Sequence, residues 1–220
     1  MDKERMKCLV QDSQAVSIRF PRIMIAAEKS GGGKTLFTCA LLSLLKEKIQ
    51  EVRAFKCGPD YIDPMFHRTV LEIPSRNLDS FFADGDTLRY LLGREVLEME
   101  KFPESRIAVL EGVMGFYDGV SGTTDTASAA HLARATGTPA VLIVRPKGQS
   151  LSLAAQIHGF RTFAENTLAG VILNDVSAGM YSFYKQIAEK AGLPVLGFLP
   201  PVPGAEIPDR HLGLVTADEL

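Results

Sequence analysis

The sequence lacks several features that would place it in a specialised class of protein. Its 220 residues contain no tryptophan and three cysteines, Cys8, Cys39 and Cys57, which show neither C-x-x-C nor Cys/His spacing. The absence of such spacing argues against a zinc site and a disulfide framework. It fits a reducing cytoplasm, which is the expected location. The formal net charge of −2 offers no basic surface, so we expect no nucleic-acid partner.

Long apolar runs are missing as well. The longest run, LFTCALLSLL at 36–45, is interrupted by polar residues and too short to span a bilayer, so we expect no membrane partner. Residues 1–21 carry charges and no continuous apolar stretch, which predicts an N-terminal extension rather than a signal peptide. The length suits one domain, expected at 22–215, with a linker beginning at 216–220.

Short apolar runs alternate with segments of helical periodicity. Near-continuous hydrophobicity is typical of parallel strands that are covered on both faces. The expected strands are 22–27, 52–57, 107–112, 139–144, 169–174 and 194–199. The expected helices are 35–48, 84–98, 125–136, 151–164 and 179–191. In the first of them, the residues expected on the buried face are Leu36, Ala40, Leu41, Leu44 and Leu45. This order predicts an α/β fold with a doubly wound, mostly parallel sheet flanked by helices.

The stretch EKSGGGKT at 28–35 lies between the first strand and the first helix. It ends like the phosphate-binding pattern G-x-x-x-x-G-K-[ST], although Glu28 stands where the first glycine belongs. Lys34 is expected to neutralise the β- and γ-phosphates of ATP, and Thr35 to bind Mg²⁺. The alternative is a glycine-rich turn before a helix. The predicted nucleotide-binding residues of this P-loop are Ser30, Gly31, Gly32, Gly33, Lys34 and Thr35.

Lys29 lies five residues before Lys34. That spacing is similar to the signature lysine of the Min- and Par-type partition ATPases, which reaches the nucleotide of the other subunit in a dimer. The alternative, which we favour, is a loop lysine in water. A homodimer is left open, and the sequence gives no role for Glu28.

Acidic residues follow the next two expected strands. In FKCGPDYIDP (55–64), Asp60 and Asp63 can hold Mg²⁺ or contact substrate; alternatively, Asp63 caps a helix that begins at Pro64 and Asp60 is a turn residue. In VLEGVMGFYDG (109–119), Glu111 ends a buried strand and is the expected second metal ligand. Asp118 binds metal or substrate, or forms an Asp-Gly turn.

Single polar residues elsewhere carry weaker signals. Lys56 ends the second strand, close to the expected position of phosphates or substrate carboxylates. Arg76 can meet a carboxylate or phosphate bidentately. Asn174 can contact an adenine edge or form a strand-end turn. The histidines, His67 among them, lack metal spacing and are expected to be structural or at the surface.

Seven stretches together point to a family. In order they are GGGKT, FKCGPDYIDPMFH, PSRNLD, LEGVMGFYDG, AGVILNDV, GLPVLGFLP and DRHLGLV. The chain from about 22 to 215 thereby resembles the synthetase domain of the cobyrinic acid a,c-diamide synthase family, in the dethiobiotin-synthetase-like branch of P-loop proteins. The resemblance implies a P-loop NTPase-like fold and an ATP- and Mg²⁺-dependent carbon–nitrogen ligase.

The resemblance also implies a mechanism and its residues. A carboxylate at the a or c side chain of a corrin ring would attack the γ-phosphate, and ammonia would displace phosphate from the acyl phosphate. Lys34 and Mg²⁺, held by Thr35, Glu111 and Asp60, would neutralise charge. The other implied roles are catalysis by Lys34, Asp60, Asp63 and Asp118, substrate contact by Lys56, Asp63, Arg76 and Asp118, and base contact by Asn174.

The family continues into a glutaminase domain, and this sequence ends at Leu220 before one could begin. We therefore expect a piece of a longer enzyme, a stand-alone subunit with a separate glutaminase, or an enzyme that uses free ammonia. Two other functions stay open. A dethiobiotin synthetase would match this chain in length and fold, but proteins of that kind lack the PDYIDP and EGVMGFYDG stretches found here. A partition-type switch ATPase is favoured by Lys29 but lacks a C-terminal amphipathic helix and a basic patch.

Overall fold

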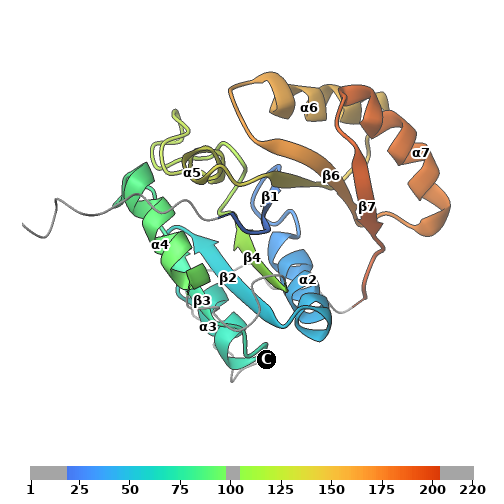
Figure 1. The fold of residues 1–220 in the computed structure, drawn as a ribbon. Helices are drawn as coiled ribbons and strands as arrows, with labels where there is room; N and C mark the ends of the chain where they lie inside the picture. Colours follow the sequence, from blue (N-terminus) through green and yellow to red (C-terminus); the bar gives the residue numbers. More distant parts are fainter. Residues whose placement is uncertain (1–18, 98–104, 204–220) are drawn as a thin grey trace, which may run out of the picture.

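A single parallel sheet runs through the middle of the molecule (Figure 1). The computed structural model describes residues 19–97 and 105–203, so the linker expected at 216–220 and most of the N-terminal extension lie outside the described residues. The sheet has seven strands in the order β3-β2-β4-β1-β5-β6-β7, and every neighbouring pair is parallel. The strands are β1 (Arg22–Ala27), β2 (Glu51–Cys57), β3 (Ser75–Leu78), β4 (Arg106–Glu111), β5 (Ala140–Val144), β6 (Leu168–Asn174) and β7 (Val195–Leu199).

Helices connect the strands and cover both faces of the sheet. One face packs Met24 and Leu110 against α4, α5, α6 and α7, whereas the other packs Ile25 and Val109 against Leu42 of α2. The predicted doubly wound α/β architecture is therefore confirmed. The helices are α2 (Lys34–Lys48), α3 (Ile62–Thr69), α4 (Gly85–Leu97), α5 (Ala129–Thr136), α6 (Leu151–Thr162) and α7 (Ala178–Ala188), with a 3₁₀ turn η1 (Glu189–Ala191).

The strand β3 was not among the expected strands. It is four residues long, and only its first and last residues, Ser75 and Leu78, are buried. Because β3 ends the strand order, it needs no continuous apolar sequence, and short, polar strands are usual at sheet edges. Because Arg76 and Asn77 are polar, this segment contains no apolar run and was not predicted as a strand.

The predicted buried face of α2 was wrong in part. The expected face comprised Leu36, Ala40, Leu41, Leu44 and Leu45. Leu44 is 56% exposed and Ala40 is exposed, whereas Thr38 and Leu42 are buried. The helix begins at Lys34, whose side chain turns inward, and Thr38 and Leu42 follow at four-residue steps on the same face. The phosphate loop, rather than hydrophobic periodicity, sets the rotation of this helix.

The expected helix 125–136 begins later, at Ala129, because Ser128 caps it. The Ser128 hydroxyl accepts a hydrogen bond from the His131 N–H at 3.1 Å, and the preceding residues 119–127 form turns. In the described part of the chain, no helix has the length and apolar character needed to cross a membrane.

Candidate functional site

The loop 28–33 connects β1 to α2 at the carboxyl edge of the sheet, the edge where ligands bind in such folds. Gly33 stands at the N-cap of α2 with φ of 92°, a left-handed conformation that suits glycine. A Cβ at Gly33 would also lie 2.2 Å from Asn174 Nδ2. Asn174, at the end of β6, donates a hydrogen bond from Nδ2 to the Gly32 carbonyl at 3.0 Å. The side chain predicted to contact a base thus holds the phosphate loop.

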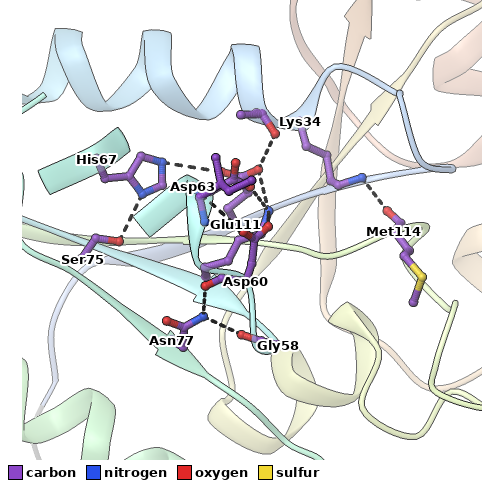
Figure 2. Close-up of polar contacts among 12 residues, drawn as sticks. Lys34, Gly58, Asp60, Asp63, His67, Ser75, Asn77, Glu111 and Met114 are labelled. Atoms are coloured by element: carbon purple, nitrogen blue, oxygen red, sulfur yellow. Dashed lines mark hydrogen bonds and ion pairs between the residues drawn. The ribbon is translucent and has the colours of Figure 1, made fainter. Parts of the chain in front are cut away.

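Lys34 turns its buried ammonium toward backbone carbonyls. Its Nζ donates to Met114 O in the loop after β4 (Figure 2). It also donates to Lys29 O at 3.3 Å. Burial, followed by the nearby Lys56 charge, lowers the pKa of Lys34 to about 8. Neutral carbonyls are modest partners for an ammonium group, and phosphate oxygens would bind it more strongly.

Thr35 and Glu111 meet directly beneath the phosphate loop. The Thr35 hydroxyl donates to Glu111 Oε1 at 2.8 Å, and Glu111 is completely buried at the end of β4. Burial raises the pKa of Glu111, against the opposing pull of the Lys56 ammonium. The second carboxylate oxygen, Oε2, has no hydrogen-bond donor in the described structure; His67 Nε2 lies 3.7 Å away.

Lys56 joins the three predicted carboxylates. Its Nζ pairs with Asp63, with Glu111 Oε1 at 2.9 Å and with Asp60 Oδ2 at 3.7 Å. Burial opposes the charge of Lys56, but Glu111 and Asp63 outweigh it and raise the pKa of the lysine. One ammonium group among three carboxylates leaves an excess of negative charge, which a divalent cation or another lysine can balance.

Asp60, rather than Asp63, accepts hydrogen bonds from the backbone N–H groups at the start of α3. Asp60 Oδ1 accepts hydrogen bonds from the N–H of Ile62 at 2.9 Å and of Asp63 at 3.4 Å. Asp63 is the second residue of α3 and is buried against Lys56, so the alternative of an Asp63 N-cap was wrong. Asn77 of β3 fixes this loop, because its Nδ2 donates to Gly58 O at 2.7 Å and to Asp60 O at 2.6 Å.

The two remaining candidates, Asp118 and Arg76, do not contact Lys56. Asp118 Oδ2 accepts the Gly115 N–H at 2.9 Å, in a turn so tight that a Cβ at Gly115 would lie 2.4 Å from it. Its charge still acts on Lys34. Arg76 pairs instead with Glu95 of α4. The structure thus brings Lys34, Thr35, Lys56, Asp60, Asp63 and Glu111 together, with Asp118 beside them and Arg76 separate.

His67, expected to be structural or at the surface, lies beside Glu111 in the candidate site. It is fully buried, its Nδ1 lies 3.1 Å from Ser75 Oγ, and its Nε2 faces Glu111. Burial lowers the pKa of His67 to about 4, so the ring is neutral at physiological pH. The available signal was its spacing: His67 follows Asp63 by four residues, which places both on one face of a helix.

Glu28, for which the sequence suggested no role, connects the phosphate loop to Arg145 and Gln156, which follow β5. Its carboxylate accepts hydrogen bonds from Gln156 Nε2 and from the Arg145 N–H at 3.4 Å. The neighbouring Lys29 is exposed and lines a cavity of about 300 Å³ that also includes Arg145 and Lys147.

The residues beneath the loop fit Mg²⁺, although within 19–97 and 105–203 no three His, Cys, Asp or Glu side chains form a ready cluster for a metal. Thr35 and Glu111 offer hydroxyl and carboxylate oxygens, the ligands that this ion prefers. The unpartnered Glu111 Oε2 and the excess of carboxylates add to this fit.

The fold and the loop define a nucleotide-binding protein of the P-loop class. Residues 23–215 match the CobQ/CobB/MinD/ParA nucleotide binding domain, and the chain belongs to that family. Similar solved structures include FtsY from Physcomitrella patens (13% identity, TM-score 0.55, 83% of this chain and 59% of that one). A second is FtsY from Elizabethkingia anophelis with GDP (11% identity, TM-score 0.57, 84% and 58%). At this identity they support the fold alone.

Curated relatives are more similar in sequence. The chain is 42% identical over 207 residues to a Cobyrinate a,c-diamide synthase of Thermoplasma acidophilum, covering 92% of this chain and 45% of the relative. It is 41% identical to the protein of the same name from Salmonella typhimurium, covering 93% and 44%. The chain therefore spans less than half the length of these relatives.

Proposed function

We propose that the chain carries out the ATP-dependent amidation of the a- and c-side-chain carboxylates of cobyrinic acid, with ammonia supplied from glutamine by another domain or subunit. The observation that carries the proposal is 42% identity, over 92% of this chain, to a relative named Cobyrinate a,c-diamide synthase. The convergence of Lys34, Thr35 and Glu111 at one edge of the sheet supports ATP as the cosubstrate.

The first step is phosphoryl transfer. A carboxylate oxygen of the substrate attacks the γ-phosphorus, the bond from that phosphorus to the β–γ bridging oxygen breaks, and an acyl phosphate and ADP form. Lys34 exchanges its contacts with Lys29 O and Met114 O for phosphate oxygens and stabilises their charge. Mg²⁺, held by Thr35 and Glu111 with Asp60 nearby, supplies further neutralisation of the phosphates when bound.

The second step is amide formation. The nitrogen of ammonia attacks the acyl carbon, the bond from that carbon to the phosphate oxygen breaks, phosphate leaves, and the nitrogen gives a proton to solvent. Lys56, which Asp63 and Glu111 hold in place, would orient the reacting carboxylate. Asp60, 3.7 Å from Lys56, and Asp118, whose charge acts on Lys34, would help to orient that carboxylate.

The test supplies the purified chain with cobyrinic acid, ATP, Mg²⁺ and ammonium chloride. We expect two carboxyl-to-amide exchanges by mass spectrometry, each accompanied by one ADP, and none in Lys34→Met. Lys46→Met, which removes an exposed lysine of the same helix, is the matched control. The proposal fails if the wild-type chain forms no amide and cobyrinic acid does not stimulate ATP turnover.

A switch ATPase is the second candidate, because the family includes MinD and ParA and because Lys29 is exposed beside the phosphate loop. It predicts a dimer that forms with ATP and is lost in Lys29→Ala, measured by light scattering. Amidation without any such dimer would exclude it.

A further inference from the structure

Two buried polar atoms face each other beneath the phosphate loop, and neither has a hydrogen-bond partner in the described part of the chain. They are Glu111 Oε2 and His67 Nε2, which lie 3.7 Å apart. Both side chains are completely buried, so bulk water reaches neither atom. The gap is roughly half an ångström longer than an ordinary hydrogen bond, and a small rotation of the carboxylate closes it. Because buried polar atoms are almost always paired, these two atoms are natural partners.

The fold places the ring of His67 across β2. Ser75 of β3 is paired with Ala54 of β2, and Ala54 is paired in turn with Val109 of β4. Glu111 follows Val109 by two residues, so Ser75 and Glu111 lie on the same face of the sheet. The β2 residue in this row is alanine, whose short side chain leaves room for a ring above the strand. Figure 2 shows the ring reaching from Ser75 toward Glu111.

The contacts of the ring decide which of its nitrogens carries the proton. Nδ1 of His67 lies 3.1 Å from Ser75 Oγ, and a hydroxyl group can donate to that nitrogen or accept from it. An ionised Glu111 carboxylate can only accept. With the proton on Nδ1, the lone pair of Nε2 would face the carboxylate oxygen in a buried site. With the proton on Nε2, the Ser75 hydroxyl donates to Nδ1 and the ring donates to Glu111, so each of these atoms has a partner.

A donor at Oε2 fixes the orientation of the Glu111 carboxylate. The other oxygen, Oε1, already accepts hydrogen bonds from Thr35 at 2.8 Å and from Lys56 at 2.9 Å. With donors on both oxygens, the carboxylate keeps its plane when Thr35 or Lys56 turns toward a ligand. Each carboxylate oxygen has about two acceptor positions, so a bond from His67 still leaves room for a cation or one of its waters.

We propose that His67 is a positioning residue: its Nε2–H donates to Glu111 Oε2 and holds the carboxylate in the orientation that binds Mg²⁺. This role rests on the proposed function, since it takes Mg²⁺ to bind beside Glu111. The imidazole touches neither substrate nor nucleotide in this role, and the Ser75 hydroxyl sets its tautomer. The loss of a contact that orients a metal ligand typically costs about tenfold to hundredfold in metal affinity.

The tautomer is measured by nuclear magnetic resonance on the full chain with ¹⁵N-labelled histidine, without metal or nucleotide. The couplings between the ring nitrogens and the carbon-bound ring protons identify the protonated nitrogen. The chain has four histidines, and the signals lost in His67→Phe assign His67. We expect the proton on Nε2. A proton on Nδ1 would overturn the proposal and does not depend on how any variant folds.

The effect on metal binding is measured with ADP by calorimetry, once in excess Mg²⁺ and once with a chelator. His67→Phe keeps a ring and removes both nitrogens, so the dissociation constant of ADP with Mg²⁺ should rise about tenfold to hundredfold. The dissociation constant with the chelator should stay unchanged, because the phosphate loop and Lys34 do not contact His67. An equal loss in both conditions would indicate a merely structural residue and overturn the proposal.

Two further variants serve as controls. His67→Gln places an amide N–H donor near the position of Nε2 and should recover most of the Mg²⁺-dependent affinity; no recovery would count against a donated hydrogen bond. His158→Phe makes the same replacement at an exposed position of α6 and should bind ADP like the wild type in both conditions.

The outcomes separate this role from the amidation. An Nε2–H tautomer together with a Mg²⁺-specific loss in His67→Phe supports the role of His67, even if the wild-type chain makes no amide. Amide formation by the wild type, with unchanged Mg²⁺-dependent ADP binding in His67→Phe, would overturn the role of His67 and leave the amidation standing. A wild-type ADP affinity that does not respond to Mg²⁺ would overturn both the Mg²⁺ site and the role of His67.

Discussion

Replacing Lys56 with methionine tests the electrostatic account of the site. Lys56 is 4% exposed and is the ammonium partner of Asp63 and Glu111, which are themselves buried. Methionine keeps much of the volume and removes the charge. Removal of one partner from a buried ion pair costs about 3–5 kcal/mol, because the remaining charge is uncompensated. For a protein of this size, that corresponds to a fall in melting temperature of roughly 6–20 °C.

The effect should also depend on pH. Without the ammonium group, burial raises the folded-state pKa of Glu111 further above its unfolded value, as it already does in part. A raised carboxyl pKa means that the folded state binds more protons than the unfolded state between the two values. The free energy of unfolding of the variant should therefore be closest to wild type below about pH 4 and fall as pH rises.

The assay is urea denaturation followed by circular dichroism, since the chain has no tryptophan to report by fluorescence. Lys46→Met is the control: its ion pair with Glu72 lies at the surface, and its removal should leave the unfolding midpoint unchanged. Equal losses in the two variants, or a Lys56→Met loss that is the same at every pH, would refute the reasoning.

Three further predictions concern single residues. Burial raises the pKa of Cys57 to about 12, so iodoacetamide at pH 8 should modify it only after unfolding, and peptide mass spectrometry that finds native labelling would contradict its burial. Asn174→Ala should lower the free energy of unfolding by about 0.5–1.5 kcal/mol through the lost bond to Gly32 O. Calorimetry should show equally weakened ATP and GTP binding in that variant; a loss confined to ATP would instead indicate a base contact. Lys29→Ala should leave ATP turnover and oligomeric state unchanged, and an ATP-dependent dimer lost in this variant would show that the lysine acts between subunits.

Part of the site could be predicted because it depends on residues close in sequence. The phosphate loop, with Lys34 and Thr35, is a local motif between a strand and a helix, and its position followed from the apolar run before it. Glu111 was recognisable as an acid at the end of a buried strand. The rotation of α2 was not predictable, because the inward turn of Lys34 sets it rather than the leucines that follow.

The sequence by itself determined the alternation of strands and helices, and hence the parallel sheet and the carboxyl edge that carries the loops. Only the tertiary structure decided which side chains meet there. Lys56 is separated from Glu111 by 55 residues and Glu28 from Gln156 by 128, and nothing local in the chain specifies either contact. The pairing of strands that are distant in sequence creates these contacts, and the low dielectric of the buried site then sets their charges.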